Sequence, residues 1–326
     1  GPLLCLPQEE PLISCAYVEL AAPTEAALRS LLAGLGGFDG PRVIDRDGLV
    51  LERRFQAMNA SAASLPPLPP DSCVVISGGL GGMGLTLARQ LAETSGVRVA
   101  LLHRSGQAPQ DLPFADYRCD VTDAAQVAAA LAAIRSEVGA VRGVIHAAGT
   151  AGAGYLLSKT REAYESVLAP KVAGTWNLHQ ATRDDDLLFF VLASSRTSLM
   201  GAPGQSDYTA ANAFLNAFAR YRRGLGLPAL ALCWNTWSGV GMAARLGVDQ
   251  GALALRPEQA FGVLAQAVGS GVDLAVVAME GEKHTQPPAS TPPAKSLAVP
   301  AGDSLDAEIL EIFRDCMGYD APLTRD

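Results

Sequence analysis

The chain has 326 residues, of which 49% are hydrophobic and 18% are charged, and its formal net charge is −8. This length suffices for one large α/β domain or two smaller ones, and the acidic balance argues against nucleic acid as a partner, because nucleic-acid-binding proteins gather Lys and Arg. No run reaches the roughly 18 apolar residues of a membrane span, and no secretory signal is visible, so we expect a cytoplasmic protein with no membrane partner. The six cysteines and four histidines form no metal-binding pattern, so we expect no metal.

The first sixty residues contain strand-like pieces around one apolar helix. Residues 14–20 and 42–55 predict strands, and residues 24–35 predict the helix between them. A proline-rich joint follows at 65–70. Because proline fixes φ and has no backbone N–H to donate to a sheet, this joint predicts a stiff connector.

Apolar strands alternate with helices from about residue 73 to residue 279. We expect strands at 73–77, 97–103, 117–121, 141–147, 187–194, 229–234 and 274–279, and helices at 85–94, 124–138 and 209–225, among others. Most of these strands are continuous apolar runs, which is typical of strands buried on both faces. The sequence therefore predicts an α/β fold with a Rossmann-like, doubly wound parallel sheet.

The last forty residues change character. A stretch at 286–300 is rich in Pro, Ala, Ser and Thr and predicts a linker. Residues 304–317 predict a helix, because Ser304 suits the N-cap position and Ile309, Leu310, Ile312 and Phe313 form an apolar face.

A glycine-rich turn joins the first predicted strand of the sheet to the helix that follows it. Glycine permits a tight turn and lets the backbone approach a pyrophosphate, which the free N–H groups and dipole of a helix N-terminus attract. We therefore expect a dinucleotide cofactor here. The turn residues expected to bind it are Ser77, Gly78, Gly79, Leu80, Gly82, Met83 and Gly84.

The second predicted strand runs into Arg104 and Ser105. An acidic residue at this place would bind the 2′-hydroxyl of NAD, whereas arginine suits the 2′-phosphate of NADP, so we expect NADPH. Further along, Asp120 and Val121 are expected to meet the adenine. The small residues Ala147, Ala148 and Gly149 are expected to let the cofactor approach the sheet.

The stretch Ser77–Gly84 resembles the TGxxxGxG fingerprint of the short-chain dehydrogenases/reductases. Ser195 and the stretch 204–212, which contains Tyr208, resemble the active-site segment of that superfamily. Most members carry Lys four residues after the Tyr, where this chain has Asn212, and Lys171 lies upstream instead. This exchange is typical of the ketoreductase domains of modular polyketide synthases.

The resemblance implies a role for each of these side chains. Tyr208 is expected to donate a proton to a ketone oxygen, and Ser195 to hydrogen-bond the same oxygen. Lys171 is expected to stabilise the phenolate and Asn212 to maintain a polar relay. The implied substrate is a β-ketoacyl thioester on the phosphopantetheine of an acyl carrier protein.

The resemblance also implies a domain organisation. Residues 1–64 are expected to be the C-terminal remnant of a ketoreductase structural subdomain, followed by the joint at 65–72. Residues 73–281 are then the catalytic domain, 282–303 a linker and 304–326 the truncated start of an acyl carrier protein. The expected partners are that carrier protein and the other domains of a parent synthase.

Two alternatives stay open at this point. One is reduction of an α-ketoacyl thioester in a peptide-synthetase or hybrid assembly line, and the other is a scaffold that keeps the fold without catalysis. Two family markers of product configuration are absent, because residues 151–153 read Ala-Gly-Ala instead of Leu-Asp-Asp and Met200 replaces a Trp. Absence of the acidic marker favours the L-hydroxy product.

Overall fold

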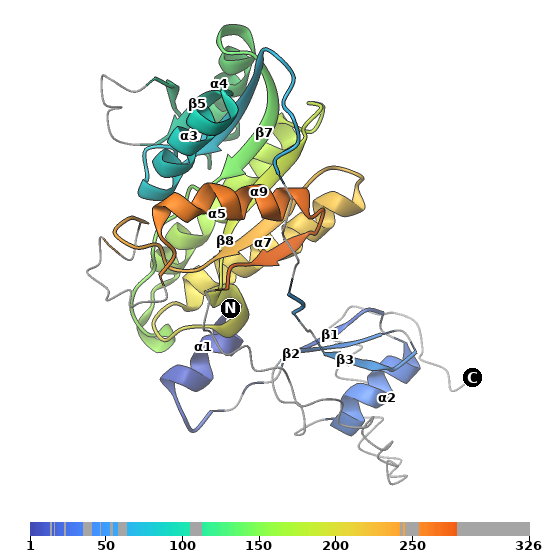
Figure 1. Cartoon of the computed structure of the whole chain (residues 1–326). Helices are drawn as coiled ribbons and strands as arrows, with labels where there is room; N and C mark the ends of the chain where they lie inside the picture. The colour runs from blue at the N-terminus through green and yellow to red at the C-terminus, as the bar shows by residue number, and fades with distance from the viewer. Residues whose placement is uncertain are drawn as a thin grey trace. The chain divides into compact units, whose positions relative to one another are not determined.

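The computed structural model of the chain forms two compact units (Figure 1). It describes residues 1–13, 15, 17–22, 24–34, 41–45, 47–52, 55–57, 64–104, 113–241, 244 and 254–278. The larger unit lies within Gly1–Ser14 and Ala57–Glu282, and the described residues of the smaller unit lie within Cys15–Gln56. The predicted linker at 286–300 and helix at 304–317 lie outside the described residues.

The smaller unit contains a three-stranded sheet and one helix. The strands β1 (Tyr17–Leu20) and β2 (Pro41–Ile44) run parallel, and β3 (Val50–Glu52) is antiparallel to β2. The helix α2 spans Glu25–Gly34. The single strand expected at 42–55 is therefore a hairpin, because the Asp45 carboxylate accepts the N–H groups of Asp47 and Leu49 and Gly48 takes φ +83°.

The larger unit contains a seven-stranded parallel sheet in the order β10-β9-β8-β7-β4-β5-β6. Its strands are β4 (Ser72–Ser77), β5 (Arg98–His103), β6 (Ala115–Arg118), β7 (Ala140–His146), β8 (Phe189–Ser195), β9 (Leu230–Trp234) and β10 (Leu274–Val276). The predicted doubly wound sheet is thus confirmed. The chain builds outward from β4 to β6 and then crosses to β7 on the other side of β4, so the topological switch point lies between β4 and β7.

Helices cover both faces of this sheet (Figure 1). The helices are α3 (Gly82–Ser95), α4 (Ala124–Glu137), α5 (Arg161–Ala181), α6 (Thr197–Met200), α7 (Ser206–Gly224) and α9 (Ala260–Gly269), with 3₁₀ turns η1 (Leu156–Ser158) and η2 (Pro257–Gln259). Val74 and Ile76 pack in the core with α3 and α9, whereas Cys73 and Val75 pack in the core with α4, α5 and α7. Alternate strand residues therefore enter opposite cores, which explains the continuous apolar runs. None of the described helices is long and apolar enough for a membrane span.

A short N-terminal helix, α1 (Pro2–Glu9), belongs to the larger unit although the predicted boundary at residue 64 separated it from the sheet. It packs on α7, where Cys5 is fully buried and its Sγ lies 3.5 Å from Thr209 Oγ1. The sequence did not predict α1, because the helix is short and contains two prolines. Pro2 is tolerated at the start of a helix, where its missing N–H costs nothing.

The side chain of Leu101 packs against the glycine turn at Gly79. This side chain is fully buried in β5, and a Cβ at Gly79 would lie 2.7 Å from the Leu101 Cβ. We expect Leu101→Ala to lower the free energy of unfolding by about 2–5 kcal/mol through the cavity that it leaves. Urea unfolding measures this loss. Leu225→Ala, at the half-exposed end of α7, serves as the control and should change stability by less than about 0.5 kcal/mol.

Candidate active site

A cavity of about 520 Å³ opens at the carboxyl edge of the large sheet. Its walls come from the segments that follow β4, β5, β6, β7, β8 and β9, together with parts of α5 and α7. Ligands of doubly wound sheets bind outside the carboxyl ends of the strands at a switch point, and this cavity lies at the one between β4 and β7.

The glycine turn forms one wall of the cavity. Gly78 takes φ +68°, and a Cβ there would lie 2.8 Å from the backbone nitrogen of Ala148. A Cβ at Gly84 would lie 2.5 Å from the carbonyl oxygen of Gly78. The helix α3 begins at Gly82 with no side chain capping its first N–H groups, so these groups remain available to an anion. Of the predicted turn residues, Gly78, Leu80, Gly82, Met83 and Gly84 line the cavity.

Ser77 and Gly79 do not line the cavity, although both were predicted to bind the cofactor. Ser77 Oγ is buried 2.5 Å from His146 Nδ1, and His146 Nε2 lies 3.0 Å from the carbonyl oxygen of Pro170. Because that oxygen only accepts, Nε2 carries the proton and Ser77 donates to Nδ1. Burial, with the charge of Lys171, lowers the pKa of His146 to about 3, so the ring is neutral. Ser77 thus stabilises the turn through its buried hydrogen bond with His146, and Gly79 stabilises it by packing closely on Leu101.

The remaining predicted cofactor residues cluster around the same cavity. Arg104 is exposed at the end of β5 and lines it, whereas Ser105 lies outside the described residues. The strand β6 ends three residues earlier than predicted, which leaves Asp120 and Val121 in the loop at the sheet edge. Residues 147–149, which are Ala147, Ala148 and Gly149, continue from β7 into the cavity wall.

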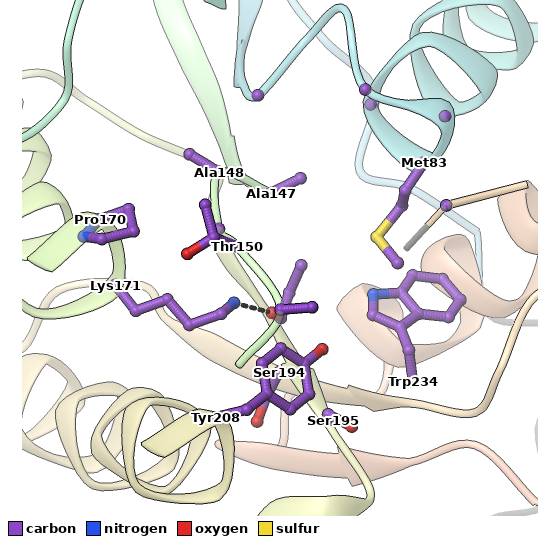
Figure 2. Close-up of a pocket in the computed structure, with 18 of the residues that line it drawn as sticks. Met83, Ala147, Ala148, Thr150, Pro170, Lys171, Ser194, Ser195, Tyr208 and Trp234 are labelled. Carbon is purple, nitrogen blue, oxygen red and sulfur yellow. Dashed lines mark hydrogen bonds between the residues drawn. The ribbon is translucent and has the colours of Figure 1, made fainter. Parts of the chain in front are cut away.

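Lys171 reaches the cavity from α5 (Figure 2). The residue is 3% exposed, and its Nζ donates a 2.9 Å hydrogen bond to the carbonyl oxygen of Ala193. Gly149 makes room for it, because a Cβ there would lie 3.1 Å from Lys171 Cε. Burial lowers the pKa of Lys171 to about 8. The ammonium group is therefore a cation that can lose its proton near neutral pH.

Tyr208 lies in the first turn of α7, and Figure 2 shows its ring beside Ser194 and Ser195 in the cavity. Burial raises the pKa of Tyr208, and hydrogen bonding with Ser195 and Asn212 opposes that shift. Ser195 Oγ, at the end of β8, accepts from Thr197 Oγ1 at 3.0 Å. This leaves the Ser195 proton to be donated to an oxygen in the cavity.

Asn212 lies one turn further along α7 and does not line the cavity. It is fully buried, and its Nδ2 donates to the carbonyl oxygen of Tyr208 at 2.7 Å. Its Oδ1 has no hydrogen-bond partner within the described part of the chain. The structure thus brings Tyr208, Ser195 and Lys171 together in the cavity and places Asn212 behind them.

Sequence reasoning missed a partly buried polar network that supports these groups. Ser194 Oγ donates to Asn216 Oδ1 at 2.7 Å, and Asn216 Nδ2 donates to Ser198 Oγ at 2.8 Å. Ser198 Oγ in turn donates to the carbonyl oxygen of Ser195 at 2.6 Å. The one sequence signal for this network is Asn216 itself, which follows Asn212 by four residues and therefore lies on the same face of α7.

Residues 72–239 match the family model described as the KR domain. The chain belongs to this KR domain family. It is 38% identical over 259 residues to the polyketide synthase GfsE of Streptomyces halstedii and 40% identical over 222 residues to the erythronolide synthase EryA2 of Saccharopolyspora erythraea. These alignments cover 74% and 63% of this chain but only 7% and 6% of the relatives, which are large synthases.

Solved structures agree with the family assignment. A structure of A-type ketoreductases from a modular polyketide synthase has a TM-score of 0.73 and 32% identity, covering 85% of this chain and 62% of that one. The ketoreductase from the first module of phoslactomycin biosynthesis in Streptomyces sp. HK803 has a TM-score of 0.74 and 29% identity, and the match covers 85% of this chain and 69% of that one. The resemblance to polyketide synthase ketoreductases is confirmed, and this KR domain is an oxidoreductase of the short-chain dehydrogenase/reductase type.

Proposed function

We propose that this KR domain uses NADPH to reduce a β-ketoacyl thioester, carried by an acyl carrier protein, to the β-hydroxyacyl thioester. The observation that carries the proposal is that Tyr208, Ser195 and Lys171 line the same cavity as the glycine turn at the start of α3. A proton donor, an oxygen-binding hydroxyl and a cation therefore meet beside a site built for a dinucleotide.

The residues of this chain fit a dinucleotide. The uncapped N-terminus of α3 would hold the pyrophosphate, and the glycines of the turn leave space that side chains would fill. Arg104 would bind the 2′-phosphate. The bound cofactor supplies the hydride that adds to the carbonyl carbon of the substrate.

Each catalytic side chain acts on the oxygen of the same ketone. Tyr208 donates its phenolic proton to the oxygen as the carbon gains hydride, so the ketone becomes a secondary alcohol and Tyr208 becomes a phenolate. Ser195 donates a hydrogen bond to this oxygen and stabilises the charge that develops on it. The Lys171 cation lowers the free energy of the phenolate, whose formation burial otherwise opposes.

The reaction can be tested by following NADPH oxidation with a β-ketoacyl N-acetylcysteamine thioester. We expect turnover and, from the absent acidic marker at 151–153, an L-hydroxy product identified by chiral chromatography. A folded protein that binds NADPH but reduces neither this thioester nor an α-ketoacyl one would refute the proposal and favour a scaffold. Turnover of the α-ketoacyl thioester alone would refute the substrate class.

Arg104→Ala tests the choice of cofactor. Loss of a charge-assisted hydrogen bond to the 2′-phosphate should raise the KM for NADPH about 10- to 100-fold and leave the KM for NADH nearly unchanged. The control is Arg118→Ala, because Arg118 is exposed at the end of β6 and does not line the cavity. Equal effects of Arg104→Ala on both cofactors would contradict the assignment.

We also propose that the chain is one portion of a multidomain synthase. The large size of the curated relatives supports this, as does the division into a unit with the cavity and a smaller unit. In this proposal residues 304–326 begin an acyl carrier protein, and the carrier domain presents the substrate. Joining this chain to a complete carrier domain should lower the substrate concentration needed for turnover.

A further inference from the structure

Two loops line the cavity beside the start of α7. The first follows β7 and contributes Thr150, Ala151 and Gly152. The second precedes α7 and contributes Ala202 and Gln205. Any ketone that reaches Tyr208 would enter the cavity that these loops line, so their positions affect its orientation.

A single carboxylate from α1 joins the two loops. Glu9 Oε2 accepts the N–H of Leu156 at 2.6 Å, within the first loop, which runs from residue 147 to residue 160 between β7 and α5. Its Oε1 accepts the N–H of Gly204 at 2.8 Å, within the second loop. Both bonds are charge-assisted and end on backbone groups, so they fix the course of the main chain on both sides.

A buried ion pair joins the first loop to the helix that carries Tyr208. Lys159 Nζ lies 2.5 Å from Asp207 Oδ2, and the two side chains are 3% and 2% exposed. Asp207 Oδ1 accepts the N–H of Tyr208 at 2.8 Å. A Cβ at Gly152 would overlap the Asp207 carboxylate, so the first loop packs directly against this pair.

The burial of this pair distinguishes it from the other ion pairs of the described residues. Arg161–Glu165 and Arg98–Asp71, for example, are largely exposed, and such pairs contribute little to stability. A buried pair is itself a weak source of stability, because desolvation offsets much of the attraction. Its effect in this place is to hold the loop and the helix together, because separating them would leave two buried charges unpaired.

We propose that Glu9, Lys159 and Asp207 are positioning residues that hold both loops against the start of α7 and thereby orient the ketone toward Tyr208. We call these three residues the clasp. The inference rests on the proposed ketone reduction, and it adds specificity determinants that lie outside the cavity wall. Small displacements of a reacting group can lower a rate strongly, so the clasp matters even though none of its members touches the substrate.

Kinetic measurements on Glu9→Gln, Lys159→Met and Asp207→Asn test the clasp. We expect kcat/KM for the thioester to fall about 10- to 100-fold, and the ratio of the two hydroxyl configurations to change. The KM for NADPH should stay the same. The matched control is Asp185→Asn, which removes the partner of Arg135 away from the cavity and should leave the product ratio unchanged.

Amide hydrogen exchange provides a readout that needs no turnover. Glu9→Gln and Asp207→Asn should speed exchange at Leu156 and Gly204 but not at the strands of the large sheet. If the wild type is active and the variants match Asp185→Asn in product ratio and exchange, the clasp is refuted. If the wild type is inactive, the proposed reduction is refuted, and the exchange rates alone decide on the clasp. Faster exchange at Leu156 and Gly204 in the variants then supports the clasp, and unchanged exchange refutes it.

Discussion

Tyr208→Phe should lower kcat for ketone reduction by about 10²- to 10⁴-fold and leave the affinity for NADPH unchanged. The phenolic proton is the one that the ketone oxygen receives, and the ring itself is kept. Burial raises the pKa of Tyr208, so the proton is present at neutral pH. Single-turnover NADPH oxidation gives the rate, and cofactor fluorescence gives the affinity.

Tyr164→Phe is the matched control for this variant. Tyr164 lies on α5, its hydroxyl donates to the carbonyl oxygen of Ser206 at 3.1 Å, and it does not line the cavity. The substitution removes one hydrogen bond near the same helix end without removing a catalytic proton. Its kcat should stay within about threefold of the wild type. If Tyr208→Phe behaved like Tyr164→Phe, Tyr208 would not be the proton donor.

Lys171→Met should lower kcat by about 100-fold, because the cation that stabilises the Tyr208 phenolate is lost. Methionine keeps much of the apolar stem that packs under Gly149, so the variant is expected to fold. Its activity, measured with saturating NADPH, should not be restored by more cofactor. Full activity of Lys171→Met would show that the cation has no part in catalysis.

The pH profile separates a charge effect from a packing effect. Lys171 has a pKa of about 8, so its cation is present below that pH and is lost as the pH rises through it. Tyr208 keeps its proton over this range because its pKa is raised. The kcat of the wild type should therefore fall above about pH 8 toward that of Lys171→Met, whose own profile should lack this fall.

The large sheet was predictable because its signals are local. Each strand of β4, β5, β7, β8 and β9 is a short apolar run, and the predicted bounds match within one or two residues. The glycine turn and Tyr208 were predictable for a related reason, because a short motif specifies each of them. The topology then brings these separate motifs to one edge of the sheet.

Contacts between distant segments were not predictable from the sequence. Nothing near Lys159 indicates that its partner is Asp207, and nothing near Glu9 indicates Gly204. Ser77 shows the same limit, because its place in a motif suggested a cofactor contact whereas the fold turns its hydroxyl toward His146. Local patterns report which face of an element is buried, but they do not report which distant group lies opposite.

The position of α1 has a consequence for the folding of this protein during its synthesis on the ribosome. Cys5 and its contact Thr209 are 204 residues apart in the chain. At synthesis rates of about 5–20 residues per second, α1 emerges roughly 10–40 s before α7 exists to receive it. During that interval Cys5 and the apolar residues beside it have no α7 to pack against. A nascent chain at this stage is therefore expected to be a substrate for chaperones that bind short apolar segments.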